Sequence, residues 1–320
     1  MCKKLISVVG ATGIQGGSVI DALLDDGTYK IRALTRNPAS VAAKELARKG
    51  VEIIAADVTD ISSLVTAFEG SSAIYAMTNF GEAYFTTGSP EQAIDVEAQQ
   101  GINLAKAAAA TKTLEHYIWS TLPNSKAVSG GKITVPQFEG KNKVEEFIRS
   151  DPSLLKKTTF FILGFYLENF SYPTFAPFEI PGAAQYVQLL CTPGDTRLLC
   201  LGFARRNIGR FVKAILEQPE KTVHGKYVSA FTEETTPEQM LKSWAKVKGK
   251  TAHYVEVGKP TFTELWTQMG NDMIAKMLDF HRSMEKNPWA GSENVLNKDD
   301  LGVTGLLDVE QSFAALNGQV

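Results

Sequence analysis

The chain contains few of the residues from which disulfide frameworks and metal sites are built. Its 320 residues include three cysteines and four histidines. Neither type recurs at the spacing of metal ligands, and three cysteines make no disulfide framework. We therefore expect no metal and no stabilising disulfide, and structural roles for the histidines. The residues concerned are Cys2, Cys191, Cys200, His116, His224, His253 and His281.

Long apolar runs and an excess of one charge are also absent. No stretch reaches the roughly 18 apolar residues of a membrane-spanning helix, and the apolar run after Lys3-Lys4 is too short for a signal peptide. The 33 basic residues nearly balance the 35 acidic ones, and no long basic run offers a surface for nucleic acid. These features predict a soluble, intracellular, cytoplasmic protein with no membrane partner and no direct nucleic-acid partner.

Glycines are concentrated where a predicted strand meets a predicted helix. The β-branched run Leu5–Val9 predicts a buried strand. The spacing Gly10-x-x-Gly13-x-x-Gly16 follows, and the next apolar residues fall on one helical face. At such a corner Gly10 permits the tight turn, Gly13 lets a phosphate approach, and Gly16 lets the helix pack closely. The corner therefore predicts a nucleotide-binding turn; the alternative is a merely tight strand–helix joint.

Strands and helices alternate through residue 163, which predicts a Rossmann-type, doubly wound parallel sheet of the α/β class. Residues 1–163 form the expected NADP-binding domain, and residues 164–320 a smaller α+β substrate or partner lobe that returns one or two elements to the sheet. The segment 78–90 is predicted to be an ordered loop. A single long helix is expected from Phe262 to Met284.

The end of the second predicted strand indicates which cofactor would be bound. NAD-selective sites usually place an acid there, against the adenosine ribose, whereas this chain has Thr35-Arg36-Asn37. A guanidinium can hold a 2′-phosphate that an acid would repel. The sequence therefore favours NADP(H) over NAD(H); the alternative is that Arg36 is a solvated loop charge.

Candidate catalytic residues lie at and after the ends of the later predicted strands. Ser120 and Thr121 supply hydroxyls. On a helical wheel, Lys141 lies about 60° from the centre of the apolar face, whereas Lys143 lies about 100° away. An inward-leaning lysine needs an anionic or hydroxylic partner, for which the nicotinamide ribose would serve; the alternative is a snorkelling surface lysine. Aromatic residues of the second half could line a substrate pocket or form ordinary core, namely Phe165, Phe170, Tyr172, Phe175 and Phe178.

Together these residues make the chain resemble the NmrA-like family, an atypical branch of the short-chain dehydrogenase/reductase superfamily. The resemblance extends over nearly the whole chain, and the sequence is also similar to isoflavone-reductase-like enzymes. Its carriers are Gly10-Ala11-Thr12-Gly13-Ile14-Gln15-Gly16-Gly17, Leu34-Thr35-Arg36-Asn37-Pro38, Phe138-Glu139-Gly140-Lys141 with Val144-Glu145-Glu146-Phe147, and Gly164-Phe165-Tyr166-Leu167-Glu168-Asn169-Phe170.

The resemblance implies a set of NADP(H)-binding positions. The turn Gly10, Ala11, Thr12, Gly13, Ile14, Gln15 and Gly16 would line the pyrophosphate, and Thr35, Arg36 and Asn37 the 2′-phosphate. Asp57 and Val58 would flank the adenine, and Thr78, Asn79 and Phe80 the nicotinamide side. Lys141 would bond the nicotinamide ribose and act in catalysis, while Tyr166 and Asn169 would approach the cofactor from the lobe.

One departure from the superfamily leaves two functions open. Ordinary members use Tyr-x-x-x-Lys, but Gln137 stands four residues before Lys141 and cannot titrate. Isoflavone-reductase-like enzymes manage without that tyrosine, and NmrA-like regulators lack it too. The sequence favours an NADP(H)-dependent oxidoreductase acting on a small carbonyl, enone or quinone-like acceptor. The alternative is a non-catalytic NADP(H) redox sensor that regulates a transcription factor or other protein partner in the cytoplasm or nucleus.

Overall fold

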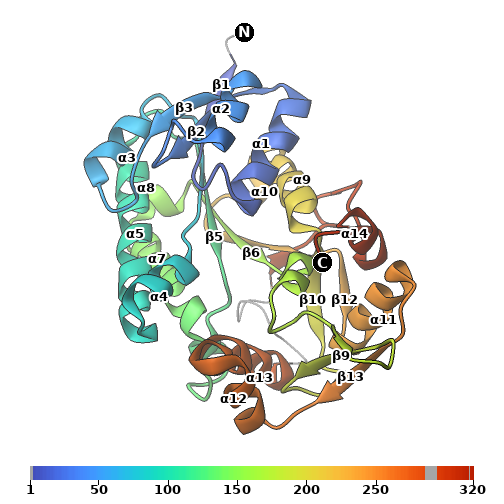
Figure 1. Cartoon of the computed structure of the whole chain (residues 1–320). Helices are drawn as coiled ribbons and strands as arrows, with labels where there is room; N and C mark the ends of the chain where they lie inside the picture. Colours follow the sequence, from blue (N-terminus) through green and yellow to red (C-terminus); the bar gives the residue numbers. More distant parts are fainter. Residues whose placement is uncertain (1–2, 285–293, 317) are drawn as a thin grey trace.

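The centre of the molecule is an eight-stranded sheet in which every pairing is parallel (Figure 1). The computed structural model describes residues 3–284, 294–316 and 318–320. The sheet order is β14-β11-β6-β5-β4-β1-β2-β3. Its strands are β1 (Lys4–Val8), β2 (Tyr29–Thr35), β3 (Glu52–Ala55), β4 (Ala73–Ala76), β5 (His116–Thr121), β6 (Thr158–Leu163), β11 (Lys226–Ala230) and β14 (Val295–Leu296). Because the order reverses between β1 and β4, a ligand crevice is expected beyond the carboxyl ends of these two strands.

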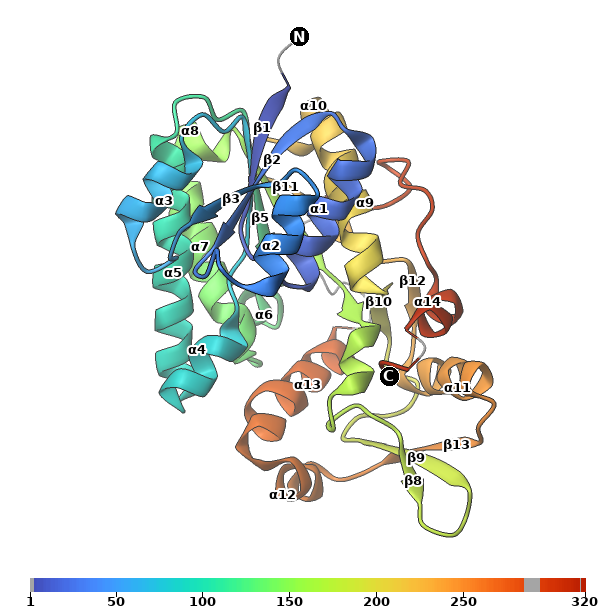
Figure 2. The ribbon, with the colours of Figure 1, turned by 45° about the horizontal axis from the view of Figure 1, so that its top comes forward.

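Helices cover both faces of this sheet, as expected for a doubly wound Rossmann-type fold (Figure 2). On one face lie α1 (Ile14–Asp26), α2 (Val41–Arg48) and α9 (Ala204–Glu217). On the other lie α3 (Ile61–Phe68), α5 (Pro90–Ala110), α7 (Pro136–Ser150) and α8 (Pro152–Leu155). The shorter helices are α4 (Phe80–Thr87), α6 (Ser125–Val128) and α10 (Pro219–Thr222).

The central strands are buried along their whole length because both of their faces are covered. Every residue of β4, β5 and β6 is buried. Trp119 and Phe160 pack into the cluster on the α5 and α7 side, and Phe161 into the cluster on the α1 and α9 side. Such continuous burial distinguishes a doubly covered parallel sheet from the alternating burial of a half-exposed one.

The second half of the chain adds two three-stranded sheets below the large one. Their orders are β12-β10-β7 and β13-β9-β8. The elements are β7 (Phe165–Tyr166), the 3₁₀ helix η1 (Leu167–Ser171), β8 (Phe178–Ile180), β9 (Gln185–Leu190), β10 (Leu198–Gly202), β12 (Glu233–Thr235), α11 (Pro237–Lys248), β13 (Ala252–Glu256), α12 (Lys259–Met269), the π-helical segment η2 (Gly270–Ala275), α13 (Lys276–Ser283) and α14 (Val309–Ala315). A separate apolar cluster forms their core.

Two expected elements differ from the structure. The segment 78–90 is not a loop, because it contains α4. Asn79 caps that helix by accepting from the Gly81 amide at 3.1 Å, and Gly88 ends it in the left-handed conformation. The sequence did not predict α4 because it contains several weak helix formers. Packing of its apolar side stabilises the helix in the structure. The helix expected from Phe262 to Met284 is interrupted by η2, whose wider turn begins at Gly270.

The second half also contributes to the first sheet. Strand β11 pairs with β6, and β14 pairs with β11, while α9 packs across α1. No described helix is long and apolar enough to cross a membrane. The division of the chain at residue 163 stays a prediction, although strands from beyond that point do lie in the large sheet.

Candidate dinucleotide site

The glycine-rich turn lies at the carboxyl end of β1, where the strand order reverses. Gly10 has a φ of +68°, which favours glycine, and a Cβ there would lie 2.7 Å from the Met77 sulfur. The Gly13 amide donates to the Gly10 carbonyl at 2.9 Å, which closes the turn. A Cβ on Gly16 would lie 2.4 Å from that same carbonyl oxygen. Gly16 therefore lets the first turn of α1 rest on the backbone of the glycine turn itself.

The amino end of α1 lacks an internal acceptor. Its N-cap is Gly13, which has no side chain to accept from the first-turn amides, whereas Ser40, Asp60 and Asn79 cap α2, α3 and α4. Thr12, Gly13 and Ile14 are exposed, but Ala11 and Gly16 are buried, so those two residues could offer a ligand only their backbone. Free amides and the positive end of the helix dipole suit a phosphate group.

Gln15 connects this turn to the ends of β4 and β5. Its Oε1 accepts hydrogen bonds from the Tyr75 hydroxyl at 2.8 Å and from the Ser120 hydroxyl at 2.9 Å. Tyr166 of β7 adjoins them, and burial together with Tyr75 and Glu168 raises its pKa, despite a hydrogen bond to Gln15. The predicted Gln15, Ser120 and Tyr166 thus meet. Tyr75 was not predicted, because in the sequence it resembles any other aromatic residue of a buried strand.

The turn after β2 holds Arg36 at the surface. Its guanidinium forms an ion pair with Glu82 of α4. Thr35 Oγ1 accepts from the Asn37 amide at 3.2 Å, and Asn37 Oδ1 accepts from the Ala39 amide at 3.0 Å. Thr35 and Asn37 therefore shape the turn that presents Arg36.

The loop after β3 approaches the same turn. The Asp57 carboxylate accepts from the amide and hydroxyl of Thr59, and these bonds, with the nearby charge of Arg36, lower its pKa. The Val58 carbonyl is fixed by the side-chain amide of Asn103 at 3.1 Å. Asp57 consequently lies near Arg36, and contacts of Asp57 and Val58 with an adenine stay a prediction.

Lys141 is buried and all of its donors are engaged. Its ammonium lies 3.0 Å from both the carbonyl and the hydroxyl oxygen of Thr78, and 3.1 Å from Glu97 Oε1. The Trp119 ring centre is 5.7 Å away. The three acceptors match the three N–H groups of a lysine. Lys141 is therefore not a snorkelling surface residue, and its anionic partner comes from the protein.

Sequence reasoning also missed Glu97. Its side chain is fully buried, and Oε2 has no hydrogen-bond partner among the described residues. It recurs at helical spacing with Ala93, Gly101 and Leu104, all buried, on the inner stripe of α5. An acid on an apolar stripe signals a buried cation nearby, so this pattern could have identified the pair.

The remaining predicted residues make hydrogen bonds and packing contacts within the protein itself. Asn79 Oδ1 is engaged in capping α4, and the Phe80 ring stacks on Tyr84 within the α4–α5 packing. Asn169 lies in η1, and its backbone carbonyl accepts a hydrogen bond from the Tyr172 amide at 2.9 Å. Their contacts with a dinucleotide stay predictions. Gln137 Nε2 donates to the Met273 carbonyl of η2 at 3.0 Å, which joins α7 to the lobe.

The lobe aromatics divide between core and surface. Phe165 stacks edge-on against Phe175 at 5.2 Å, and Phe170 against Phe313 at 4.9 Å, all within the lobe core. Tyr172 and Phe178 are exposed. Three of these five aromatic residues therefore belong to the ordinary hydrophobic core of the lobe, which was the alternative to a substrate pocket.

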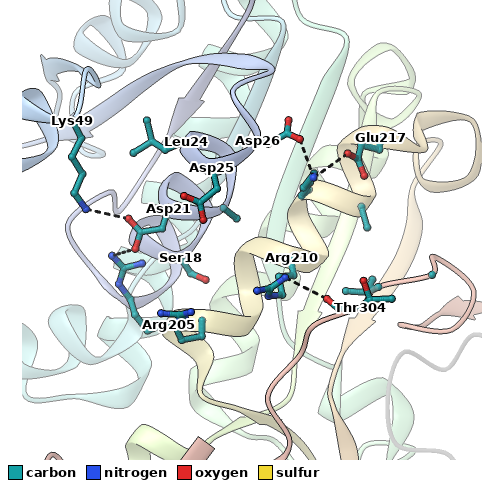
Figure 3. A pocket seen from close by; sticks show the side chains of 16 residues that line it. Ser18, Asp21, Leu24, Asp25, Asp26, Lys49, Arg205, Arg210, Glu217 and Thr304 are labelled. Carbon is teal, nitrogen blue, oxygen red and sulfur yellow. Dashed lines mark hydrogen bonds and ion pairs between the residues drawn. The ribbon is translucent and has the colours of Figure 1, made fainter. Parts of the chain in front are cut away.

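A charged groove of about 990 Å³ lies elsewhere, between α1, α9 and residues 302–304 (Figure 3). None of the residues of the glycine turn from Gly10 to Gly16 lines it. Its charges are largely paired with one another: Asp21 with Arg205 at 2.8 Å, and Asp26 with Lys213 at 2.9 Å. The candidate dinucleotide site is therefore the turn and not this groove.

Histidines and cysteines are not gathered into a metal site. Among the described residues, no group of three or more histidine, cysteine or acidic side chains could hold an ion. His116 Nε2 pairs with Thr159 Oγ1 at 2.8 Å. Cys191 and Cys200 are buried free thiols, and Cys2 lies outside the described residues.

Known proteins match this chain along most of its length. A model of the NmrA-like family matches residues 2–315. An NmrA-like family domain-containing oxidoreductase of Aspergillus hancockii is 36% identical over 180 residues, covering 54% of this chain and 50% of that protein. The chain thus spans half of that relative. A second such oxidoreductase, of Aspergillus campestris, is 29% identical over 266 residues, covering 80% of this chain and 76% of the relative.

Solved structures share the fold at lower identity. The negative transcriptional regulator NmrA is 21% identical in its complexes with NAD and with NADP, with TM-scores of 0.76 and 0.74, covering 98% of this chain and 95% of that one. An NADPH-dependent quinone oxidoreductase of Escherichia coli, crystallised with NADPH, is 18% identical with a TM-score of 0.68, covering 97% of this chain and 99% of that one.

Proposed function

This chain belongs to the NmrA-like family, and from that premise we propose that it is an NADP(H)-dependent oxidoreductase acting on a small carbonyl, enone or quinone-like acceptor. Two relatives bear the name oxidoreductase. A structural neighbour from Escherichia coli is an NADPH-dependent quinone oxidoreductase. The observation that carries the proposal is the uncapped amino end of α1 behind an exposed glycine turn at the switch point of the sheet.

The residues around this turn fit a phosphorylated dinucleotide. The first-turn amides of α1 have no side-chain cap and suit a pyrophosphate. Arg36 stands at the end of β2, where a 2′-phosphate would be held, beside Asp57 and Val58 on the adenosine side. The bound dinucleotide would supply the hydride from its nicotinamide ring.

The chain's own hydroxyls would hold the acceptor oxygen. Ser120 lies at the carboxyl end of β5 and can turn its donor from Gln15 toward a ligand. Tyr166 stays protonated at neutral pH because burial raises its pKa, so it also remains a donor. Lys141 would act chiefly by fixing Thr78 on the nicotinamide side, and would reach the ribose only by exchanging one of its three acceptors.

The test of this function combines binding with turnover. Calorimetry should show NADPH binding, and a panel of quinones, enones and aldehydes should include one that oxidises bound NADPH. Ser120→Ala should lower kcat with little change in NADPH affinity. Absence of any heat with NADP⁺ and NADPH would overturn the proposal.

The cofactor preference has its own test. Arg36→Ala should weaken NADP(H) binding by about tenfold or more, because a charge-assisted contact to phosphate is lost. NAD(H) binding should change little. Equal losses for the two cofactors would remove Arg36 from this role.

A second candidate function is a redox sensor that binds NADP(H) and controls a protein partner in the cytoplasm or nucleus. It is supported by Gln137, which replaces a titratable tyrosine and ties α7 to the lobe through the Met273 carbonyl. No acceptor would then be reduced. A partner's affinity would instead differ between the empty and the NADP(H)-bound protein, which pull-down with and without NADPH measures.

A further inference from the structure

The ion pair between Arg36 and Glu82 joins two separate segments at the adenosine end. Arg36 follows β2, whereas Glu82 lies in the first turn of α4. The two side chains are 64% and 48% exposed. Asp57 is also close enough for the charge of Arg36 to act on it. The one guanidinium assigned to a 2′-phosphate is therefore already paired with the carboxylate of Glu82, and a second carboxylate, that of Asp57, lies near enough to feel its charge.

A 2′-phosphate would need the same guanidinium. Such a phosphate carries a charge of roughly −1.5 to −2. It accepts hydrogen bonds from the same guanidinium N–H groups of arginine to which a carboxylate binds. Glu82 would compete for those donors and would repel the phosphate if it stayed in place. A dinucleotide without this phosphate does not have to displace Glu82. The cost of Glu82 therefore falls on NADP(H) selectively.

The competition is reversible because the pair is exposed. Exposed ion pairs contribute little to stability, since water and salt screen them. A phosphate of higher charge can therefore displace the carboxylate. Displacement would release the Glu82 side chain and loosen the first turn of α4, while Phe80 and Tyr84 stay packed in a cluster that also contacts Met273 of the lobe.

We propose that Glu82 is a specificity-determining residue, which competes with the 2′-phosphate for Arg36 and so reduces the preference for NADP(H) over NAD(H). The same pair holds the first turn of α4 against the β2 turn until the phosphorylated dinucleotide binds. This inference rests on the proposed function, because it presumes dinucleotide binding at the glycine turn.

The test compares NADP⁺ and NAD⁺ affinities by calorimetry for the unmodified chain, Glu82→Gln and Glu82→Lys. We expect NADP⁺ to bind about three- to tenfold more tightly to Glu82→Gln and more tightly again to Glu82→Lys, with less effect at high salt. NAD⁺ affinity should stay within about twofold. Asp95→Asn is the matched control, because Asp95 is an exposed acid paired with Lys143 at 2.7 Å.

Hydrogen exchange provides a second readout. Amides in the first turn of α4 should exchange modestly faster when NADP⁺ is added, but not when NAD⁺ is added, and should do the same in Glu82→Gln without ligand, because the exposed pair is a weak restraint on a helix that Asn79 also caps. An unchanged NADP⁺/NAD⁺ affinity ratio in both Glu82 variants, or the same shift in Asp95→Asn, overturns the role of Glu82 alone. No binding of either dinucleotide by any variant overturns the proposed function and this inference with it.

Discussion

Single buried charges have the largest consequences at the residue scale. Lys141 and Glu97 are both almost fully buried, and each is the other's charge partner. Burying two charges is costly, and breaking such a pair leaves one charge uncompensated. The pair is therefore a demanding structural feature directly beside the predicted nicotinamide side, where it fixes Thr78.

Removing both charges of this pair should destabilise the fold by less than the sum of the two single removals. Glu97→Leu and Lys141→Met should each lower the free energy of unfolding by about 3–5 kcal/mol, since each strands the other charge. The double variant should lose clearly less than the sum of the two. Urea denaturation of all four proteins measures the coupling, and simple additivity would show that the two charges do not act as a pair.

Glu145 should make stability depend on pH. Burial raises the pKa of its carboxyl to about 7, although hydrogen bonds from Thr121 and Tyr227 oppose that rise. The folded chain thus keeps a proton that the unfolded chain releases above about pH 4.3. The free energy of unfolding should therefore fall by up to about 3 kcal/mol as pH rises from about 5 to about 8.

The measurement is urea unfolding of the unmodified chain and of Glu145→Gln at both pH values. His116 and His281, whose pKa values burial lowers to about 4, contribute an opposite trend. Both proteins share that trend, so the difference between them isolates Glu145. Parallel pH profiles for the two proteins would exclude this assignment.

At the scale of elements, helix contacts depend on glycines that allow close backbone approach. Gly209 of α9 would place a Cβ 2.1 Å from the Ser18 carbonyl and 2.7 Å from the Ala22 Cβ of α1. Its amide also donates to Ser18 Oγ at 2.8 Å. The position of α1, and with it the glycine turn, is therefore fixed by an element far along the chain.

Gly209→Ala should push α9 away from α1. We expect a loss of about 1–3 kcal/mol in the free energy of unfolding, as for other overpacked contacts, together with weaker NADPH binding. Gly258→Ala is the matched control, because its nearest neighbour would be Pro260 Cδ at 3.8 Å. Thermal melts and calorimetry compare the two; equal behaviour would mean that the α1–α9 contact is loose.

The whole molecule is assembled from both halves of the chain. α9 covers the apolar side of α1, where Ile208 and Phe211 share a cluster with Val19 and Ile20. Strand β11 covers the edge of β6. The first 163 residues consequently contain most of the candidate site and an incomplete core.

A fragment of residues 1–163 should not fold into a monomer. It would expose the face of α1 that α9 covers and leave β6 as an open sheet edge, which favours aggregation. Size-exclusion chromatography and circular dichroism test this expectation. A monomeric, folded fragment that binds NADPH would instead show that the first half is self-sufficient.

Local patterns in the sequence were enough to predict the fold class and the glycine-rich turn after β1. The order of strands and helices, the Gly10–Gly16 corner and the buried strand Thr158–Leu163 follow from residues close in the chain, where periodicity and glycine act directly. Helix α4 was missed because its stabilising contacts come from α5, although Asn79 and Gly88 were visible as its cap and its end.

Only the tertiary structure decided which side chains contact one another in the candidate site. Lys141 meets Thr78 from 63 residues away, Arg36 meets Glu82 from 46, and Ser120 meets Gln15 from 105. Periodicity shows which face a side chain takes, but not what will lie opposite, because that depends on how the helices cross the completed sheet. The sequence by itself thus determined a Rossmann-type nucleotide turn, while only the packed molecule determined that its lysine and its arginine each already hold a carboxylate.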